Sequence, residues 1–121
     1  MSETDVQSVS DVVRRAVAVV DRDGGDPIVA DLLLAYEDDD RTATGLGDSF
    51  WDELRGTVDA LDPERTSAPA AVAAAVAYFL STQPAGGSDR DGTIREAVRV
   101  GYGGEPPHHV AAWLAAQGID D

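Results

Sequence analysis

Apolar residues recur along most of this chain at spacings of three and four, the pattern of helices that each bury one face. Residues 68–80 depart from this pattern, because APAAVAAAVAYFL carries no charge and only one hydrogen-bonding side chain, that of Tyr78. A helix that is apolar on every side is buried or paired with another chain. Since a bilayer span needs about 20 such residues, this stretch is too short to cross a membrane. We therefore expect the rest of the chain to be organised around residues 68–80.

The first striped segment predicts a helix over residues 5–21, with Thr4 as its N-terminal cap. Valine also suits strands, but a period of two would place Asp11 and Arg14 on the apolar face, so the helical period is favoured. The stripe consists of Val6, Val9, Val13, Val17 and Val20.

Two further helices are predicted before the central stretch. The second begins at Asp26-Pro27, since Asp is a favoured cap and Pro suits the first helical position. The third begins at Ser49, whose spacing from Asp52 resembles a capping box. It stops before Pro63, because the residue that precedes a proline is displaced from helical geometry.

The central helix and the next one also carry start signals. Ser67 precedes the apolar stretch, and Pro69 falls in its first turn. Thr93 and Glu96 form a capping box that predicts the start of the fifth helix.

A sixth helix is predicted from the Pro-Pro pair at residues 106–107 to Gly118. Glycine just past a helix end, followed by an apolar residue, is the sequence of a Schellman motif. We therefore expect Ile119 to contact Leu114.

These segments predict an all-α fold, a compact single-domain bundle of five or six short helices around the Ala-rich central helix. The length of 121 residues is that of one domain, which we assign to residues 1–121. The chain shows no internal repeat and no convincing strand.

Charge is the most unusual feature of the composition. The chain has 23 Asp and Glu residues against 9 Arg and no Lys, a net charge of −14. The acids are spread along the sequence, which favours adaptation to molar salt over an acidic tail. Nucleic acids and anionic membranes are unfavourable partners for such a chain. Clusters of acidic residues are therefore weak indicators of a site.

The sequence lacks the residues that several kinds of functional site require. Without cysteine, the chain has no disulfide, thiolate metal site or Cys nucleophile. It also lacks phosphate-binding glycine motifs and a GxSxG nucleophile motif, so we predict no cofactor and no metal site. The first ten residues are polar and acidic, unlike an export signal, and predict a cytoplasmic protein.

The candidate catalytic residues are Tyr102, Glu105, His108 and His109. Tyr102 and Glu105 belong to a glycine-containing loop, and both histidines lie at the start of the last helix, whose N-terminus would hold an imidazole neutral. Adjacent histidines point about 100° apart on a helix, so these two would not share one metal ion. A metal-dependent or His-based enzyme centred on residues 102–109 is the third hypothesis.

Residues 93–118 offer a second hypothesis, a helix-turn-helix-like pair in a DNA-associated regulator. Arg95 and Arg99 lie one turn apart on the first helix of the pair. The second helix begins with prolines and histidines, however, whereas a recognition helix needs Arg, Asn or Gln near its start.

Protein–protein interaction or regulation, with a partner protein or as a homodimer, is the favoured function. If the neighbouring helices leave part of the central helix uncovered, a second chain must cover the rest. The candidate interface residues are Ala71, Ala74, Ala75 and Tyr78.

Overall fold

The computed structural model describes residues 8–21, 25–42, 46–82, 90–103 and 105–119. Six helices pack together in these ranges, which hold no strand beyond an isolated bridge between Ser8 and Thr42. The prediction of an all-α bundle is confirmed. The helices are α1 (Val9–Val20), α2 (Pro27–Tyr36), α3 (Asp48–Leu61), α4 (Ala68–Thr82), α5 (Arg90–Tyr102) and α6 (His108–Ala116).

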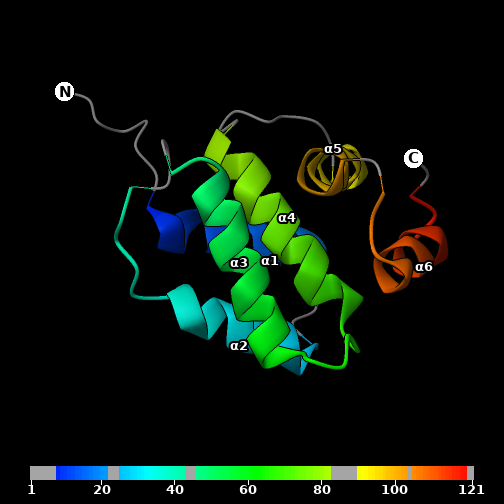
Figure 1. Ribbon diagram of the computed structural model, residues 1–121, viewed down its shortest axis with the longest axis horizontal. Coiled ribbons are helices and arrows are strands. Elements are labelled where there is room, and N and C mark those ends of the chain that lie inside the picture. The colour runs from blue at the N-terminus through cyan, green and yellow to red at the C-terminus, as the bar shows by residue number, and fades with distance from the viewer. Residues whose placement is uncertain (1–7, 22–24, 43–45, 83–89, 104, 120–121) are drawn as a thin grey trace.

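Helix α4 is the centre of the bundle, as its uniformly apolar sequence predicts (Figure 1). All five other helices pack against it, α1 and α5 most extensively. Every residue from Ala70 to Ala77 is buried. Within the described ranges, no helix is both long and apolar enough to span a bilayer.

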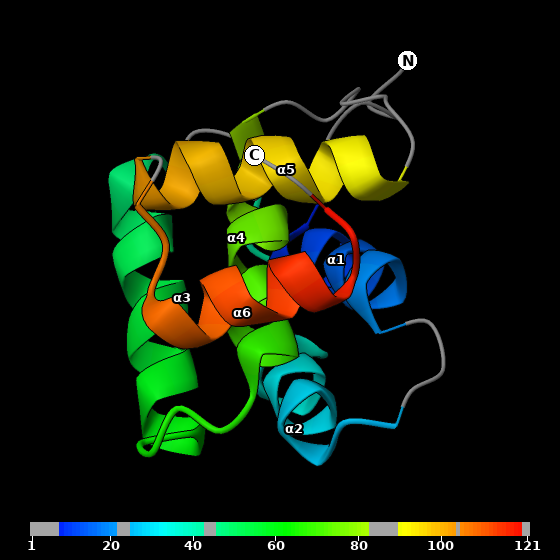
Figure 2. The same cartoon turned by 90° about the vertical axis from the view of Figure 1, so that its right-hand side faces the viewer.

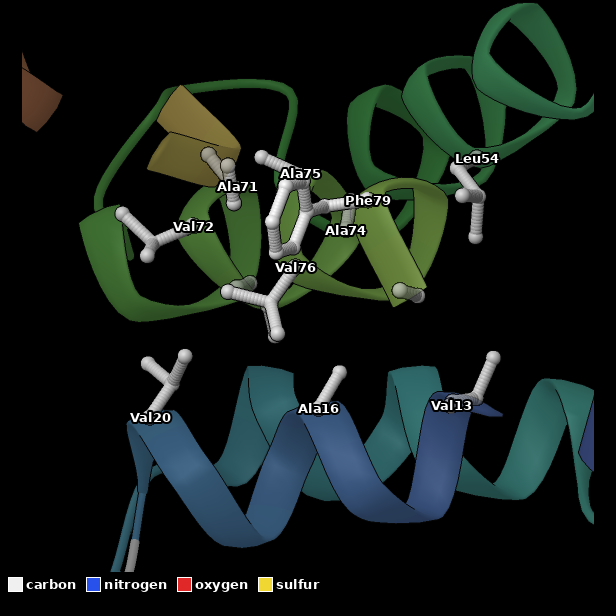
Figure 3. Packing of buried hydrophobic residues seen from close by; sticks show 14 of the residues in the cluster. Val13, Ala16, Val20, Leu54, Ala71, Val72, Ala74, Ala75, Val76 and Phe79 are labelled. Carbon is white, nitrogen blue, oxygen red and sulfur yellow. The ribbon is translucent and has the colours of Figure 1, made fainter. Parts of the chain in front are cut away.

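Small side chains allow α1 and α4 to approach closely (Figure 3). Ala16 of α1 faces α4 between Val13 and Val20, Val76 of α4 points back toward it, and Val72 lies one turn earlier on α4. All five side chains are at most 5% exposed. The valine stripe of the first helix is therefore the surface that covers one side of the central helix.

Two predicted N-terminal caps are present. The Asp26 carboxylate accepts hydrogen bonds from the backbone N–H groups of Ile28 at 2.8 Å and Val29 at 3.2 Å, with Pro27 in the first helical position. Ser67 Oγ accepts one from the Ala70 N–H at 3.2 Å. Each bond satisfies an amide that has no partner inside its own helix.

The predicted Schellman motif at the end of α6 is confirmed. Gly118 has φ +76°, and the Ile119 N–H donates to the Leu114 carbonyl at 2.9 Å. The Gly118 N–H donates to the Ala115 carbonyl at 3.1 Å, which completes the pair of bonds. Leu114 and Ile119 are both buried, so the chain end is folded back against the helix.

Helix α1 starts later than its valine stripe predicts. It begins at Val9, and its cap is Ser8, which accepts from the Asp11 N–H at 3.1 Å. The expected cap Thr4 lies outside the described residues.

The start of α1 is fixed by a distant segment. The N–H groups of Val9 and Ser10 donate to the carbonyls of Arg41 at 2.8 Å and Asp39 at 2.9 Å. These first amides of a helix need an external acceptor. Here the linker between α2 and α3 supplies it, which a local pattern cannot indicate.

The capping box expected at Ser49 and Asp52 is wrong. Helix α3 begins at Asp48, after Gly47 with φ +65°, and it has no side-chain cap. The Ser49 hydroxyl instead donates to the carbonyl of Leu46 at 2.7 Å.

The capping box expected at Thr93 and Glu96 is also wrong. Helix α5 begins at Arg90, so Thr93 lies inside the helix, where it is buried. The Glu96 carboxylate pairs with Arg99 at 2.9 Å. Thr93 and its neighbour Ile94 both belong to the buried face of α5. The helix therefore already includes the residues before Thr93 and does not start at the apparent capping box.

Candidate functional site

A small polar pocket lies where the end of α3 and the turn after it meet α4, the end of α5 and the start of α6. Its volume is about 70 Å³. We call it the junction pocket. Its polar lining consists of Arg55, Asp59, Asp62, Arg65, Tyr102 and His109.

Asp62 holds the turn between α3 and α4. One carboxylate oxygen accepts from the Thr66 N–H at 2.8 Å and the Thr66 hydroxyl at 2.7 Å, and the other accepts from the Ser67 N–H at 2.7 Å. Burial tends to raise the pKa of Asp62, but these three hydrogen bonds outweigh it and lower the pKa. Asp62 is thus a structural anion that positions both Ser67 and the turn.

Arg65 sits in that turn with φ +57°, and it is the one non-glycine residue of the described ranges with a positive φ. Its N–H donates to the Asp62 carbonyl at 3.0 Å. The left-handed conformation costs an L-residue about 1–2 kcal/mol relative to the right-handed one. The turn thereby places the cationic side chain of Arg65 at the junction pocket. Glycine would adopt this backbone conformation with less strain.

Tyr102 joins the pocket to an aromatic cluster. Its ring meets Trp51 edge to face with centroids 5.1 Å apart, and Tyr78 stacks on Trp51 at 5.5 Å. The Arg55 guanidinium lies 5.8 Å from the Trp51 ring centroid. Burial raises the pKa of Tyr102 to about 12, so its phenol is a neutral hydrogen-bond donor at pH 7.

His109 lies at the second position of α6, partly buried against the pocket. Burial is the main cause that lowers its pKa, Arg65 lowers it further, and Asp62 opposes them. The imidazole is therefore neutral at pH 7.

The structure brings together two of the four candidate catalytic residues. Tyr102 and His109 both line the junction pocket. Glu105 and His108 are exposed and do not line it. Within the part of the chain that the structure describes, no group of three or more potential metal ligands forms.

A second hollow is lined by residues of α5, of α6 and of the segments that flank α6. The two helices both pack on α4, and the volume of this apolar cleft is about 270 Å³. We call it the α5–α6 cleft. Its lining includes Arg95, Val98, Ala111, Leu114, Ala115 and Ile119.

The same two helices carry the predicted DNA-binding residues. Helices α5 and α6 run in opposite directions side by side (Figure 1 and Figure 2), whereas the two helices of a helix-turn-helix cross at about 90–120°. Arg95 lines the α5–α6 cleft. Arg99 is exposed and pairs with Glu96 at 2.9 Å. The two arginines do not combine into a basic groove-binding surface of the expected kind.

The candidate interface residues of α4 do not form a free surface. Ala71 is 5% exposed, Ala74 1% and Ala75 0%, because neighbouring helices of the same chain cover them. Tyr78 is half-buried on Trp51, and its hydroxyl donates to Asp48 at 2.8 Å. These three alanines of the central helix are therefore covered without a second chain.

Comparison with protein-family models, curated proteins and solved structures finds no match to this chain. Its function must be argued from the two hollows and from the charge of the chain.

Proposed function

We propose that the protein is a protein-interaction module whose α5–α6 cleft receives apolar side chains of a partner protein. The observation that carries this proposal is the cleft itself. Its apolar lining is contributed by Val98, Leu114 and Ile119, which are otherwise buried in the core. An apolar side chain of a partner placed in this hollow would complete the packing of these residues.

The size and chemistry of the cleft favour side chains of a protein over a small substrate. A volume of about 270 Å³ is just below the range of about 300–1,000 Å³ that is usual for small-molecule pockets. Among the described residues that line it, Arg95 alone carries a charge, and none is an acid, a histidine or a hydroxyl-bearing residue. An amphipathic helix that lays its apolar face into a groove needs this chemistry.

Charge favours a basic partner over a second copy of the chain. At low ionic strength the net charge of −14 attracts a cationic segment and repels an identical molecule, and molar salt screens both effects. The proposed occupant is therefore an amphipathic segment with apolar residues on one face and Lys or Arg on the other.

The test uses a fluorescent amphipathic peptide of about 14 residues made of Leu and Lys, with a Leu and Glu peptide as its comparison. Binding is measured by fluorescence anisotropy. Replacing Ala111 and Ala115 by Gln obstructs the cleft without changing charge, since both alanines are exposed and line it. Ala112→Gln with Ala116→Gln is the matched control, because these alanines are exposed on the same helix outside the cleft.

We expect the basic peptide to bind, and the cleft double variant to weaken it by about tenfold or more. The control double variant should bind like the parent protein. Equal loss in both variants, or absence of binding, would overturn the proposal. Light scattering in about 2 M KCl should give a monomer; a dimer lost in the cleft variant would assign the cleft to a second copy.

Salt adaptation is part of the same proposal. Of the acidic side chains that the structure describes, Asp62 alone is buried, and the others are at least partly exposed. Acids such as Asp31, Asp38, Asp40 and Asp52 lie on the surface. Their mutual repulsion would be screened at molar salt. The cytoplasmic location stays a prediction from the sequence.

A further inference from the structure

We infer that the junction pocket binds one small carboxylate, held between the guanidinium groups of Arg55 and Arg65. This site is separate from the α5–α6 cleft and uses different residues. Its ligand class is a monocarboxylate, free or as part of a small molecule.

The two arginines carry the inference. Arg55 comes from α3 and Arg65 from the following turn, and both side chains reach the same pocket. Neither forms an ion pair with a carboxylate anywhere in the described ranges, although acids outnumber arginines by 23 to 9 in this chain. Arginine presents a planar fork of donors that matches the two oxygens of a carboxylate.

The two acids of the pocket do not form ion pairs with these arginines, although they balance their charge. The oxygens of Asp62 already accept three hydrogen bonds from Thr66 and Ser67. Asp59 lines the pocket from the exposed surface of α3. Two guanidinium groups against two carboxylates leave the pocket with little net charge, which favours a singly charged carboxylate over a doubly charged phosphate.

Neutral donors border the same space. The Tyr102 hydroxyl has no hydrogen-bond partner among the described residues, and it stays protonated at neutral pH. The first turn of α6 also reaches the pocket through Pro107 and His109. That helix has no side-chain cap, so its first amides and its dipole add a positive field.

The volume fits a head group and not a larger ligand. A space of about 70 Å³ accommodates several water molecules, because one water needs about 10–15 Å³ by this measure. A carboxylate head group fits this space with its remaining chain directed to solvent.

Trp51 provides the measurement, because Arg55 lies over its ring. The protein is prepared with Trp113→Phe, so that the fluorescence comes from Trp51 alone. Potassium acetate replaces potassium chloride at a constant total concentration of about 1 M, which keeps screening constant. Potassium phosphate at matched ionic strength is the comparison anion.

The variants separate binding from folding. Arg65→Gly removes the guanidinium, and glycine accepts the left-handed backbone without strain, so the turn persists. Arg55→Gln removes the second guanidinium group of the proposed site. Arg14→Gln changes the net charge by the same amount at an exposed ion pair with Asp11, remote from the pocket, and is the control.

We expect a saturable fluorescence change with acetate, weakened by about tenfold or more in Arg65→Gly and Arg55→Gln and unchanged in Arg14→Gln. A linear response, or equal responses in all variants, would overturn the site. Tighter binding of phosphate than of acetate would overturn the ligand class. Circular dichroism of each variant confirms that the loss of binding does not come from unfolding.

Discussion

The side chains of Asp26 and Ser67 join the N-termini of two helices that lie 41 residues apart in the sequence. Ser67 Oγ donates to one oxygen of Asp26 at 2.9 Å, while the other oxygen caps α2. The same Ser67 oxygen accepts from the Ala70 N–H and so caps α4. Each cap therefore orients the other.

This pair predicts coupled stabilities. Asp26→Ala and Ser67→Ala each remove a cap and should each lower the unfolding free energy by about 1–2 kcal/mol. Because each change also removes the bond between the caps, the double variant should lose less than the sum, by about 0.5–1.5 kcal/mol. Urea unfolding of the four proteins measures the coupling. Additive losses would show that the two caps act independently.

Gly101 and Trp51 give a packing prediction. A Cβ atom at Gly101 would lie 3.0 Å from Trp51 Cζ2 and 3.1 Å from its Cη2, so Gly101→Ala forces the indole to move. Because this contact opposes the gain that alanine brings inside a helix, we expect Gly101→Ala to be less stable than Gly56→Ala by about 1–3 kcal/mol and to shift the emission of Trp51. Gly56 is the matched control, because it lies inside α3 and a Cβ there meets nothing within 4 Å. Gly56→Ala should stabilise the protein by about 0.5–1 kcal/mol. Equal effects at the two glycines would contradict the packing around Trp51.

His109 predicts a pH dependence. Its pKa in the folded protein lies below the unfolded value of about 6.5, so the unfolded chain binds more protons in that range. The contribution of His109 is therefore fully present above about pH 6.5 and is lost as the pH falls through the folded pKa. His109→Gln should flatten the fall in stability in this window, measured by urea unfolding at each pH. His108→Gln, on the exposed surface, is the control and should keep the slope.

Tyr102 predicts a second pH window with the opposite sign. Its folded pKa of about 12 lies above the unfolded value of about 10, so the folded state binds the proton more tightly. This contribution is fully present below about pH 10 and disappears as the pH rises toward 12. Tyr102→Phe should reduce the decline between these values in thermal melts, and Tyr36 and Tyr78, whose pKa values are also raised, should account for the remainder. A decline of equal size in the variant would assign it to another group.

Salt should stabilise the fold. Melting temperatures followed by circular dichroism should rise between about 0.1 M and about 2 M KCl, because screening reduces repulsion among the exposed acids. Asp38 and Asp40 are exposed just beyond the C-terminus of α2, where the helix dipole disfavours negative charge. Asp38→Asn with Asp40→Asn should therefore raise the melting temperature more at low salt than at high salt. A gain independent of salt would argue against repulsion as the cause.

Local sequence determined the helices and several of their ends. The Asp26-Pro27 start and the Gly118-Ile119 end depend on hydrogen bonds that reach only two to five residues, so their residue types suffice to predict them. The apolar sequence of α4 determined its central place, since no polar face could meet water.

Other helix starts depended on distant groups. The amides at the start of α1 bind carbonyls of Arg41 and Asp39, which the valine stripe does not encode. Helix α5 starts before its apparent capping box, and Thr93 is buried inside the helix instead of capping it. The same short motif can be a cap or the interior of a helix, and tertiary packing selects between them.

The junction pocket was decided almost entirely by tertiary structure. The sequence indicated Tyr102 and His109 because they lie close together along the chain. Arg55, Asp62 and Arg65 join them from roughly 40 residues earlier, through the packing of α3, α5 and α6 around α4. Sequence determined which faces are apolar, because that depends on neighbouring residues one helical turn apart. Only the tertiary structure decided which polar residues meet and which alanines are covered, because both depend on how separate helices pack.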